Sequence, residues 1–347
     1  MATNSNYKAK DIEVLEGLEP VRKRPGMYIG STNQDGLHHL VNEILDNSID
    51  EVLAGHGSKI NFRYKKNGAI TIKDDGRGIP IDFHPKYKNK RAFEVVLTKL
   101  HSGGKFNSST YKTSGGLHGV GISVVNALSS ILKVNVFKSG KVYSQEYSKG
   151  KVKTKVKIEK CDKKMKGTEI TFIPDETIFD STSYDINRLY NFINMKSVLV
   201  GGTTITFDVD RELIKDKTPN KKEFFYKNGI ADFFKLEYSN REKLFEKDFS
   251  VKNKLNQNEN FEVHISFNKN KFSNFKSYCN TIETPDGGSH EVGLKNGIIK
   301  AIKIFGQKNQ MSKVNNINQN DLFDFTDVII SIFINDPSFE GQTKKRI

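Results

Sequence analysis

Residues 37–54 place the strongest constraint on how this chain can fold. Their apolar side chains recur three and four positions apart, as on one face of an α-helix, at Leu37, Leu40, Val41, Ile44, Leu45 and Val52. A rotation of about 100° per residue brings polar side chains together on the opposite face, namely His39, Glu43, Asp46, Asn47 and Asp50. By itself, such a face is either a solvated acidic surface or one wall of a binding site.

The segments that follow alternate between apolar and polar residues like the strands of an antiparallel sheet. Two strands are expected at 60–64 and 69–73, on either side of the turn-forming pair Asn67-Gly68. Further strands are expected at 133–137, 142–147 and 168–173, and a buried helix is expected to start within 122–128. Because helices and strands do not alternate as in βαβ units, the sequence predicts an α+β sandwich.

The length of 347 residues suggests two domains. A strand pattern at 200–210 is followed by a charged run at 215–222 that contains a proline, which predicts domains at 1–217 and 218–347. The second domain is expected to hold strands at 261–267, 275–282 and 326–334, a helix at 289–305, and Asn/Lys/Gln-rich loops at 250–260 and 306–320.

The formal net charge of +14 suggests a polyanionic partner, because clustered lysines and arginines gain affinity for phosphates by releasing counterions. A lysine-rich but merely solvated surface is the alternative. Cys161 and Cys279 lie far apart, which argues against disulfide and zinc sites and fits a reducing cytoplasm. We expect no membrane association, because the chain has no apolar run of about eighteen residues and no secretion signal.

Two glycine-containing segments are candidates for ligand contact. Residues 74–80 read DDGRGIP directly after a strand, and their glycines would let the backbone approach a planar ligand, although turn formation is the alternative. Residues 113–121 read TSGGLHGVG and open a helix, where backbone amides could hold phosphate. This second segment lacks the Gly-Lys-Ser/Thr ending of a P-loop, and a flexible linker is the alternative.

In this order and spacing, the polar helix and the two glycine segments resemble the GHKL ATPase superfamily of type II topoisomerases, Hsp90 chaperones, MutL and sensor histidine kinases. Residues 22–30, 100–106 and 114–121 are similar to signatures of the B subunits of bacterial gyrase and topoisomerase IV. The resemblance runs from about Tyr7 to residues 341–344, which are similar to the QTK loop of that family.

This resemblance implies a GHKL (Bergerat) ATPase sandwich, followed by a ribosomal protein S5 domain 2-like transducer domain that is shortened after the QTK loop. Residues 84–86, 174–179 and 284–290 look more like topoisomerase IV than gyrase. The expected function is that of an N-terminal fragment of a topoisomerase IV B subunit, which drives ATP-dependent DNA strand passage with an A subunit.

The resemblance also implies roles for the catalytic residues. Glu43 is the general base for the water that attacks the γ-phosphate, and such assistance is typically worth ~10²–10⁴-fold in rate. His39 orients Glu43, and Asn47 holds the Mg²⁺ that bridges the phosphates of ATP. Lys344, together with Gln342, reaches the γ-phosphate from the second domain and reports which nucleotide is bound.

At the other end of the nucleotide, Asp74 is implied to accept a hydrogen bond from the adenine amino group, assisted by Thr168. The 113–121 segment is implied to close over the phosphates as a lid. The other residues implied to bind ATP are Tyr7, Arg77, Gly78, Pro80, Lys105, Tyr111, Gly115, Gly116, Leu117, His118, Gly119, Val120 and Gly121.

The implied partners are a second copy of the chain on ATP binding, with the arm around Tyr7 reaching across, an A subunit, and double-stranded DNA. Lys295, Lys300 and Lys303 are candidates for contacts with that DNA, or else form a solvated helix face. Because no Glu-Gly-Asp-Ser-Ala segment follows, the chain is expected to hydrolyse ATP without cutting DNA.

Three alternatives remain open at this point. The first is a gyrase B subunit, which would support negative supercoiling. The second is a nucleotide-gated dimerisation clamp with little hydrolysis. The third is a basic nucleic-acid-binding protein in which the glycine segments are only turns.

Overall fold

The computed structural model describes residues 8–104, 115–116, 119–341 and 343–347. Within these residues, nine strands form a mixed sheet in the order β11-β10-β1-β2-β9-β5-β6-β7, with β8 paired to β6. The pairing of β1 with β10 is parallel, and that of β1 with β2 is antiparallel. The strands are β1 (Lys59–Tyr64), β2 (Ile70–Asp74), β5 (Ser129–Lys138), β6 (Lys141–Ser148), β7 (Lys151–Val152), β8 (Lys157–Lys160), β9 (Gly167–Pro174), β10 (Thr204–Val209) and β11 (Lys221–Phe225).

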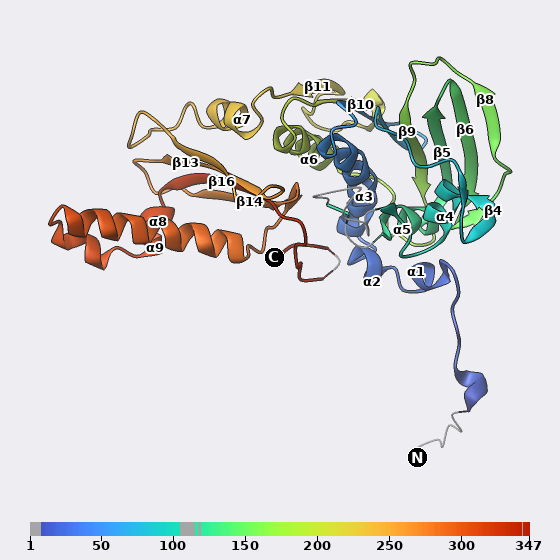
Figure 1. Cartoon of the computed structure of the whole chain (residues 1–347), viewed down its shortest axis with the longest axis horizontal. Helices are drawn as coiled ribbons and strands as arrows, with labels where there is room; N and C mark the ends of the chain where they lie inside the picture. Colours follow the sequence, from blue (N-terminus) through green and yellow to red (C-terminus); the bar gives the residue numbers. More distant parts are fainter. Residues whose placement is uncertain (1–7, 105–114, 117–118, 342) are drawn as a thin grey trace.

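Helices cover one face of this sheet, and the burial of its strands shows which face. In β1, Ile60, Phe62 and Tyr64 are buried, while the residues between them are exposed. The helices of this unit are η1 (Ala9–Asp11), α1 (Glu19–Lys23), α2 (Gly26–Ile29), α3 (Gln34–Leu53), α4 (Ala92–Thr98), α5 (Gly121–Ala127), α6 (Ile186–Leu199) and η3 (Arg211–Leu213). A small separate hairpin consists of the strands β3 (Phe83–His84) and β4 (Tyr87–Arg91). The predicted α+β sandwich is confirmed (Figure 1).

The helix predicted at 37–54 is confirmed as α3, which begins one turn earlier. Asn33 caps its N-terminus by accepting a hydrogen bond from the backbone N–H of Asp35 at 2.8 Å. The predicted apolar stripe lies in the core, with Leu37, Leu40 and Leu45 fully buried. The hairpin predicted around Asn67-Gly68 is confirmed as β1 and β2.

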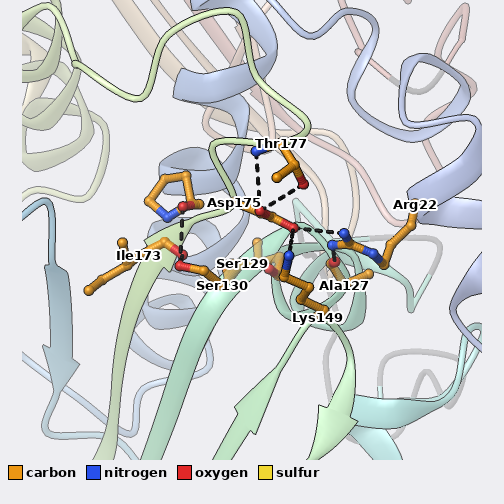
Figure 2. Close-up of polar contacts among 10 residues, drawn as sticks. Arg22, Ala127, Ser129, Ser130, Lys149, Ile173, Asp175 and Thr177 are labelled. Atoms are coloured by element: carbon orange, nitrogen blue, oxygen red, sulfur yellow. Dashed lines mark hydrogen bonds and ion pairs between the residues drawn. The ribbon is translucent and has the colours of Figure 1, made fainter.

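The buried carboxylate of Asp175 helps to fix the C-terminal end of α5 (Figure 2). Asp175 follows β9, and its side chain pairs with Arg22 at 2.7 Å and with Lys149 at 3.2 Å. The Arg22 guanidinium also donates to the carbonyl of Ala127, the last residue of α5, at 2.7 Å. Thr177 donates to Asp175 through both its backbone N–H and its hydroxyl. This network joins α1, α5 and the turn after β6.

The second, smaller unit lies beside the first (Figure 1). Five strands of its described residues form a sheet in the order β12-β13-β16-β14-β15, in which β14 and β16 are parallel. Val263, Ile265, Val328 and Ile330 form its core with helical residues such as Leu294. Its elements are α7 (Ile230–Glu237), β12 (Phe249–Lys254), β13 (Asn260–Phe267), β14 (Asn274–Cys279), β15 (Ile282–Glu283), α8 (Ser289–Lys308), η4 (Ser312–Asn316), α9 (Gln319–Phe323) and β16 (Thr326–Phe333).

The predicted domain boundary after residue 217 needs correction. β11 lies beyond that position, yet it pairs with β10 along Thr204 to Asp208 and therefore extends the first sheet. Most of the charged run at 215–222 lies in the connection between β10 and β11, which explains why its composition resembles that of a linker. We propose that the division between the units lies after Phe225 and before Ile230, where α7 begins.

Two loop predictions in the second unit were partly wrong. Residues 250–254 belong to the edge strand β12, whose mostly exposed side chains hide the apolar alternation on which strand prediction depends. Residues 306–320 include the end of α8, the 3₁₀ helix η4 and the start of α9. Among the described residues, no helix combines the length and apolar character needed to cross a bilayer.

Candidate active site

A cavity of about 820 Å³ opens in the first unit, where α3 faces β2, β9 and the start of α5. Its volume lies in the range of small-molecule and cofactor sites. The predicted site residues that line it are Glu43, Asn47, Asp74, Arg77, Gly78, Pro80, Gly116, Gly119, Val120, Gly121, Thr168 and Lys344. Glu43 and Asn47, from the polar face of α3, therefore form part of the wall of this cavity.

Glu43 stands at the junction of α3 and α5. Its carboxylate lies 3.1 Å from the imidazole Nε2 of His39, one helical turn earlier, and both side chains are nearly buried. A Cβ placed on Gly121, the first residue of α5, would come within 1.9 Å of Glu43 Oε2. Only glycine at that position leaves the carboxylate in place, so the start of α5 and the Glu43 side chain are fitted to each other.

Asn47 lies one turn beyond Glu43 on the same wall. Its side-chain nitrogen donates to the backbone carbonyl of Glu43 at 2.8 Å. This contact fixes the orientation of the amide and identifies its carbonyl oxygen as the atom suited to ligate a cation. His39 does not line the cavity and touches it only through Glu43.

Asp74, at the end of β2, is a buried acceptor at the base of the cavity. Its carboxylate accepts hydrogen bonds from the backbone N–H of Gly76 at 2.9 Å, from that of Thr168 at 3.2 Å and from the hydroxyl of Ser48 at 3.2 Å. Burial nevertheless raises the pKa of Asp74 to about 6, because desolvation outweighs these donors and Glu51 adds a like charge nearby.

The turn after Asp74 is held by a residue that the sequence did not single out. Glu51 of α3 accepts from the backbone N–H of Arg77 at 2.9 Å and from two guanidinium nitrogens of the same residue at 2.8 and 3.1 Å. Gly78 then adopts a φ of +74°, in the region that favours glycine. The Thr168 hydroxyl accepts from the N–H of Ile79 at 3.2 Å, which joins β9 to this turn.

Lys344 reaches the first unit from the second. It lies in a turn at the tip of a loop closed by the hydrogen bond from Glu340 N–H to Arg346 O, and its side chain is buried. Its ammonium donates to the carbonyl of Gly115 at 2.9 Å. Asp50 of α3 accepts from the N–H groups of Gly115 and Gly116 at 2.9 and 3.3 Å.

The remaining predicted residues divide into two groups. Gly115 does not line the cavity, but its carbonyl accepts a hydrogen bond from Lys344, which does. Tyr7, Lys105, Tyr111, Leu117, His118 and Gln342 lie outside the described residues.

Residue-by-residue reasoning missed three supporting side chains, Ser48, Asp50 and Glu51, which hold Asp74, the glycine loop and Arg77. The helical spacing places Asp50 on the polar face of α3 but indicates no role for it. A search of the same helix for further acidic and hydroxyl side chains facing the glycine segments would have suggested all three.

Taken together, these side chains give the cavity two chemically different ends. One end holds a buried carboxylate, Asp74, beside apolar lining residues such as Ile72 and Ile170. The other end holds the Glu43 carboxylate, which His39 contacts from outside the cavity, together with the Asn47 amide and glycine-rich backbone. The first suits a planar group with hydrogen-bond donors, and the second suits an anionic group and an acid–base step.

Comparison with known protein families agrees with this division. Residues 32–178 match the family described as histidine kinase-, DNA gyrase B- and HSP90-like ATPase. Residues 229–347 match the family described as DNA gyrase B. The first match covers α3, the Asp74 turn and α5, and the second covers the unit that carries Lys344.

Individual proteins extend the similarity over nearly the whole chain. The chain is 46% identical over 347 residues to the B subunit of DNA topoisomerase 4 from Rickettsia bellii, a match that covers 99% of the chain and 52% of that protein. It is 43% identical over 345 residues to the B subunit of DNA gyrase from Enterococcus faecalis, a match that covers 98% of the chain and 52% of that protein. The chain therefore spans about half the length of these curated relatives.

A solved structure is similar over nearly the whole chain. The topoisomerase IV ATP-binding domain of Francisella tularensis, in complex with a small-molecule inhibitor, has a TM-score of 0.75 and 36% sequence identity to the chain. The match covers 96% of the chain and 86% of that domain. The chain belongs to the family of bacterial gyrase and topoisomerase IV B subunits, within the histidine kinase-, DNA gyrase B- and HSP90-like ATPases.

Proposed function

We propose that this chain binds ATP in the cavity beside α3 and hydrolyses it as the ATPase part of a topoisomerase IV B subunit. The observation that carries the proposal is that candidate residues from distant parts of the sequence line the same cavity. A single cavity is lined by Glu43 and Asn47 from α3, Asp74 from β2, the glycine residues before α5, and Lys344 from the second unit. These residues come from distant parts of the sequence.

Adenine is assigned to the Asp74 end. A carboxylate has about four acceptor positions, so Asp74 can accept from the adenine amino group while it keeps its three protein donors. Thr168 supports the same edge through its backbone and hydroxyl. Guanine presents a carbonyl oxygen where adenine presents an amino group, so a buried carboxylate here favours adenine.

The phosphates are assigned to the Glu43 end. Glu43 takes a proton from the attacking water, and His39 holds the carboxylate in place from outside the cavity. Gly116, Gly119 and Gly121 border the same region with backbone that has no side chain to obstruct phosphate. The ammonium of Lys344 stands at the edge of this end and is assigned to the γ-phosphate.

The donor set fits Mg²⁺ that arrives with the nucleotide. No group of three or more His, Cys, Asp or Glu side chains in the described parts of the chain could hold a metal ion unaided. Mg²⁺ commonly uses few protein ligands together with substrate phosphates. Asn47 would supply one oxygen, and bound Mg²⁺ would neutralise charge on the phosphates.

For the whole protein, we propose ATP-dependent strand passage of duplex DNA with an A subunit in the bacterial cytoplasm. Relatives named topoisomerase 4 and gyrase are both similar to the chain, and the slightly higher identity to the former supports topoisomerase IV. Of the proposed DNA contacts, Lys295 is already paired with Glu291 at 2.5 Å, which leaves Lys300 and Lys303 as the better candidates.

ATP-dependent dimerisation through the N-terminal arm is part of this proposal. The segment before α1 extends away from the body of the first unit (Figure 1). Its apolar residues Ile12 and Val14 are 59% and 78% exposed. Such side chains would gain from burial against a second copy of the chain.

The test measures ATP turnover and the binding of a non-hydrolysable ATP analogue in parallel. Glu43→Ala is expected to lower turnover by ~10²–10⁴-fold while the Kd of the analogue changes by less than about threefold. Glu237→Ala, which removes an exposed glutamate of α7, serves as the matched control. If dimerisation is required, wild-type turnover rises with the square of protein concentration.

Each alternative gives a different result. A dimerisation clamp would bind the analogue and dimerise without measurable turnover, whereas a plain nucleic-acid-binding protein would not bind the analogue. Retained turnover in Glu43→Ala would remove Glu43 as the base. Negative supercoiling by the full-length protein, reconstituted with each candidate A subunit, would favour gyrase over topoisomerase IV.

A further inference from the structure

A buried lysine of α6 connects the cavity wall to the second unit. The side chain of Lys196 is only 4% exposed, and its ammonium lies 2.5 Å from Asp46 Oδ1 of α3. The same ammonium donates to the backbone carbonyl of Thr281 at 2.8 Å, and the Thr281 hydroxyl lies 3.5 Å away. One cation thus contacts α3 and the turn between β14 and β15.

That turn has an unfavourable backbone conformation for its sequence. Cys279 pairs with Ile282, so the hairpin loop consists of Asn280 and Thr281, with φ values of +49° and +66°. A β-branched residue is rare at positive φ, and glycine is the usual residue at the second position of such a turn. Strain of this kind persists where the surroundings fix it, which is typical of functional positions. Here the strained conformation directs the Thr281 carbonyl toward the Lys196 ammonium, from which it accepts a hydrogen bond.

The same turn also touches the glycine loop of the cavity. A Cβ on Gly115 would lie 3.3 Å from the carbonyl oxygen of Asn280 and 3.5 Å from the side chain of Ile282, so the two backbones are in close contact. Gly115 is in turn held by Asp50. The turn therefore meets α3 by two routes, through Lys196 to Asp46 and through Gly115 to Asp50.

We propose that Lys196 is a positioning residue that couples the second unit to the catalytic wall of the cavity. Asp46 directly precedes Asn47 and follows Glu43 by three positions, so a displacement of Asp46 moves α3 at both residues. Lys196 itself does not line the cavity. This inference rests on the proposed ATPase function, and it assigns a second connection between the units besides Lys344.

Stability alone does not account for this arrangement. Burying an ion pair removes both charges from water, and well-packed apolar residues of similar size often stabilise a fold equally well. What the charged pair adds is specificity, because the ammonium is satisfied only when α3 and the 280–281 turn stand in one relative position. A coupling residue requires that property.

The test is a double-mutant cycle in the full chain, with Lys196→Met, Asp46→Asn and the combined variant. Lys222→Met, at an exposed site on β11, is the control. Either single change leaves one buried group unmatched and can lower the melting temperature, whereas the combined variant leaves no unpaired charge. If a single variant does not fold, coupling is assessed by comparing the combined variant with the wild type.

The first readout needs no nucleotide. Hydrogen exchange of the backbone amides at 280–284 should rise at least about threefold on Asp46→Asn when Lys196 is present, and should show no further rise in the Lys196→Met background. Effects of the two substitutions that simply add would overturn the coupling. This holds whether or not the protein hydrolyses ATP.

The second readout is enzymatic. The combined variant should bind the ATP analogue with a Kd within about threefold of wild type and lose roughly 3- to 30-fold in kcat, the range for residues that modulate coupling. Wild-type kcat in a folded combined variant would overturn the role in catalysis. If the wild-type chain binds no nucleotide while the exchange cycle shows coupling, the proposed ATPase function fails and the connection stands.

Discussion

Asp74 occupies a position that is unfavourable for an isolated carboxylate. Its pKa of about 6 in the folded protein exceeds the ordinary value of 3.8, chiefly because burial penalises the charge. Between these two values the folded protein binds more protons than the unfolded chain, so the free energy of unfolding falls as pH rises through that window. A residue that lowers stability at neutral pH and lines a cavity is typical of a functional site.

Asp74→Asn should therefore separate binding from stability. The amide can still accept from Gly76 and Thr168, but its nitrogen would face the adenine amino group, so the Kd for the ATP analogue should rise roughly 10- to 100-fold. The free energy of unfolding at pH 7 should rise by about 1–2 kcal/mol. Calorimetric titration and urea unfolding between pH 4 and 7 measure both. A less stable variant at pH 7 would contradict this account of the buried charge.

Gly121 offers a way to move Glu43 without removing it. In Gly121→Ala, the added Cβ would displace the Glu43 carboxylate, so turnover should fall roughly 10- to 100-fold. Analogue binding should change by less than about tenfold, because the adenine end is untouched.

Gly26→Ala is the matched control for Gly121→Ala. Gly26 is also the first residue of its helix, α2, but open space surrounds the position of its Cβ. The rate of ATP hydrolysis, measured under single-turnover conditions, is compared between the two variants. Equal activities of the two variants would show that turnover does not depend on the observed position of the Glu43 carboxylate.

At the scale of elements, α5 is fixed at both ends. The Glu43 carboxylate packs against its first residue, and Arg22 with Asp175 holds its last turn (Figure 2). Although burial would raise the pKa of Asp175, hydrogen bonds from Arg22, Thr177 and Lys149 lower it to about 2. The stabilisation by this carboxylate is therefore fully present above the ordinary value of 3.8 and is lost as pH falls toward 2.

Asp175→Asn should loosen this anchorage. We expect a loss of about 2 kcal/mol in the free energy of unfolding at pH 7, because the neutral amide no longer balances Arg22. The difference from wild type should shrink as pH falls from about 4 to 2. Urea unfolding across that range measures it, with the exposed Asp180→Asn as control. A difference that stays constant with pH would show that packing, and not charge, explains the loss.

At the scale of the whole molecule, three of the connections between the two units in the described parts of the chain differ in chemical character. Apolar residues of α6 and α7 form one cluster with Tyr278 and Ile329 of the second sheet. Lys196 forms the second connection and Lys344 the third. The first is apolar and tolerant of small shifts, whereas the other two depend on hydrogen-bond geometry. The polar connections are therefore those that can transmit the state of the cavity.

Lys344→Met should weaken communication between the units more than nucleotide binding. Loss of the ammonium removes the hydrogen bond to Gly115 and the charge assigned to the γ-phosphate, so turnover should fall roughly 10²–10³-fold. Analogue affinity should fall by less than about tenfold. Lys345→Met, at the exposed neighbouring position, is the control. A change in Kd as large as the change in turnover would place Lys344 in binding alone.

The sequence by itself determined the local elements and the segments that could form a site. The 3.6-residue period of α3, the hairpin around Asn67-Gly68 and the glycine segments are all properties of residues a few positions apart. Such patterns depend on backbone geometry that is the same in every protein. They were sufficient to predict an α+β sandwich and to make the polar helix and the glycine segments candidates, whereas the selection of Glu43, Asn47 and Asp74 came from the resemblance of these segments to a known family.

Only the tertiary structure decided which distant side chains meet. Lys344 and Gly115 are separated by 229 positions, and Lys196 and Thr281 by 85. No local period relates such pairs, because their contact depends on how α6, the second sheet and the glycine loop pack together. The same reason explains why the sequence predicts the wrong unit for β11 and indicates no role for Glu51 and Asp50. The sequence thus supplied the candidate groups, and the packing of the two units fixes their positions.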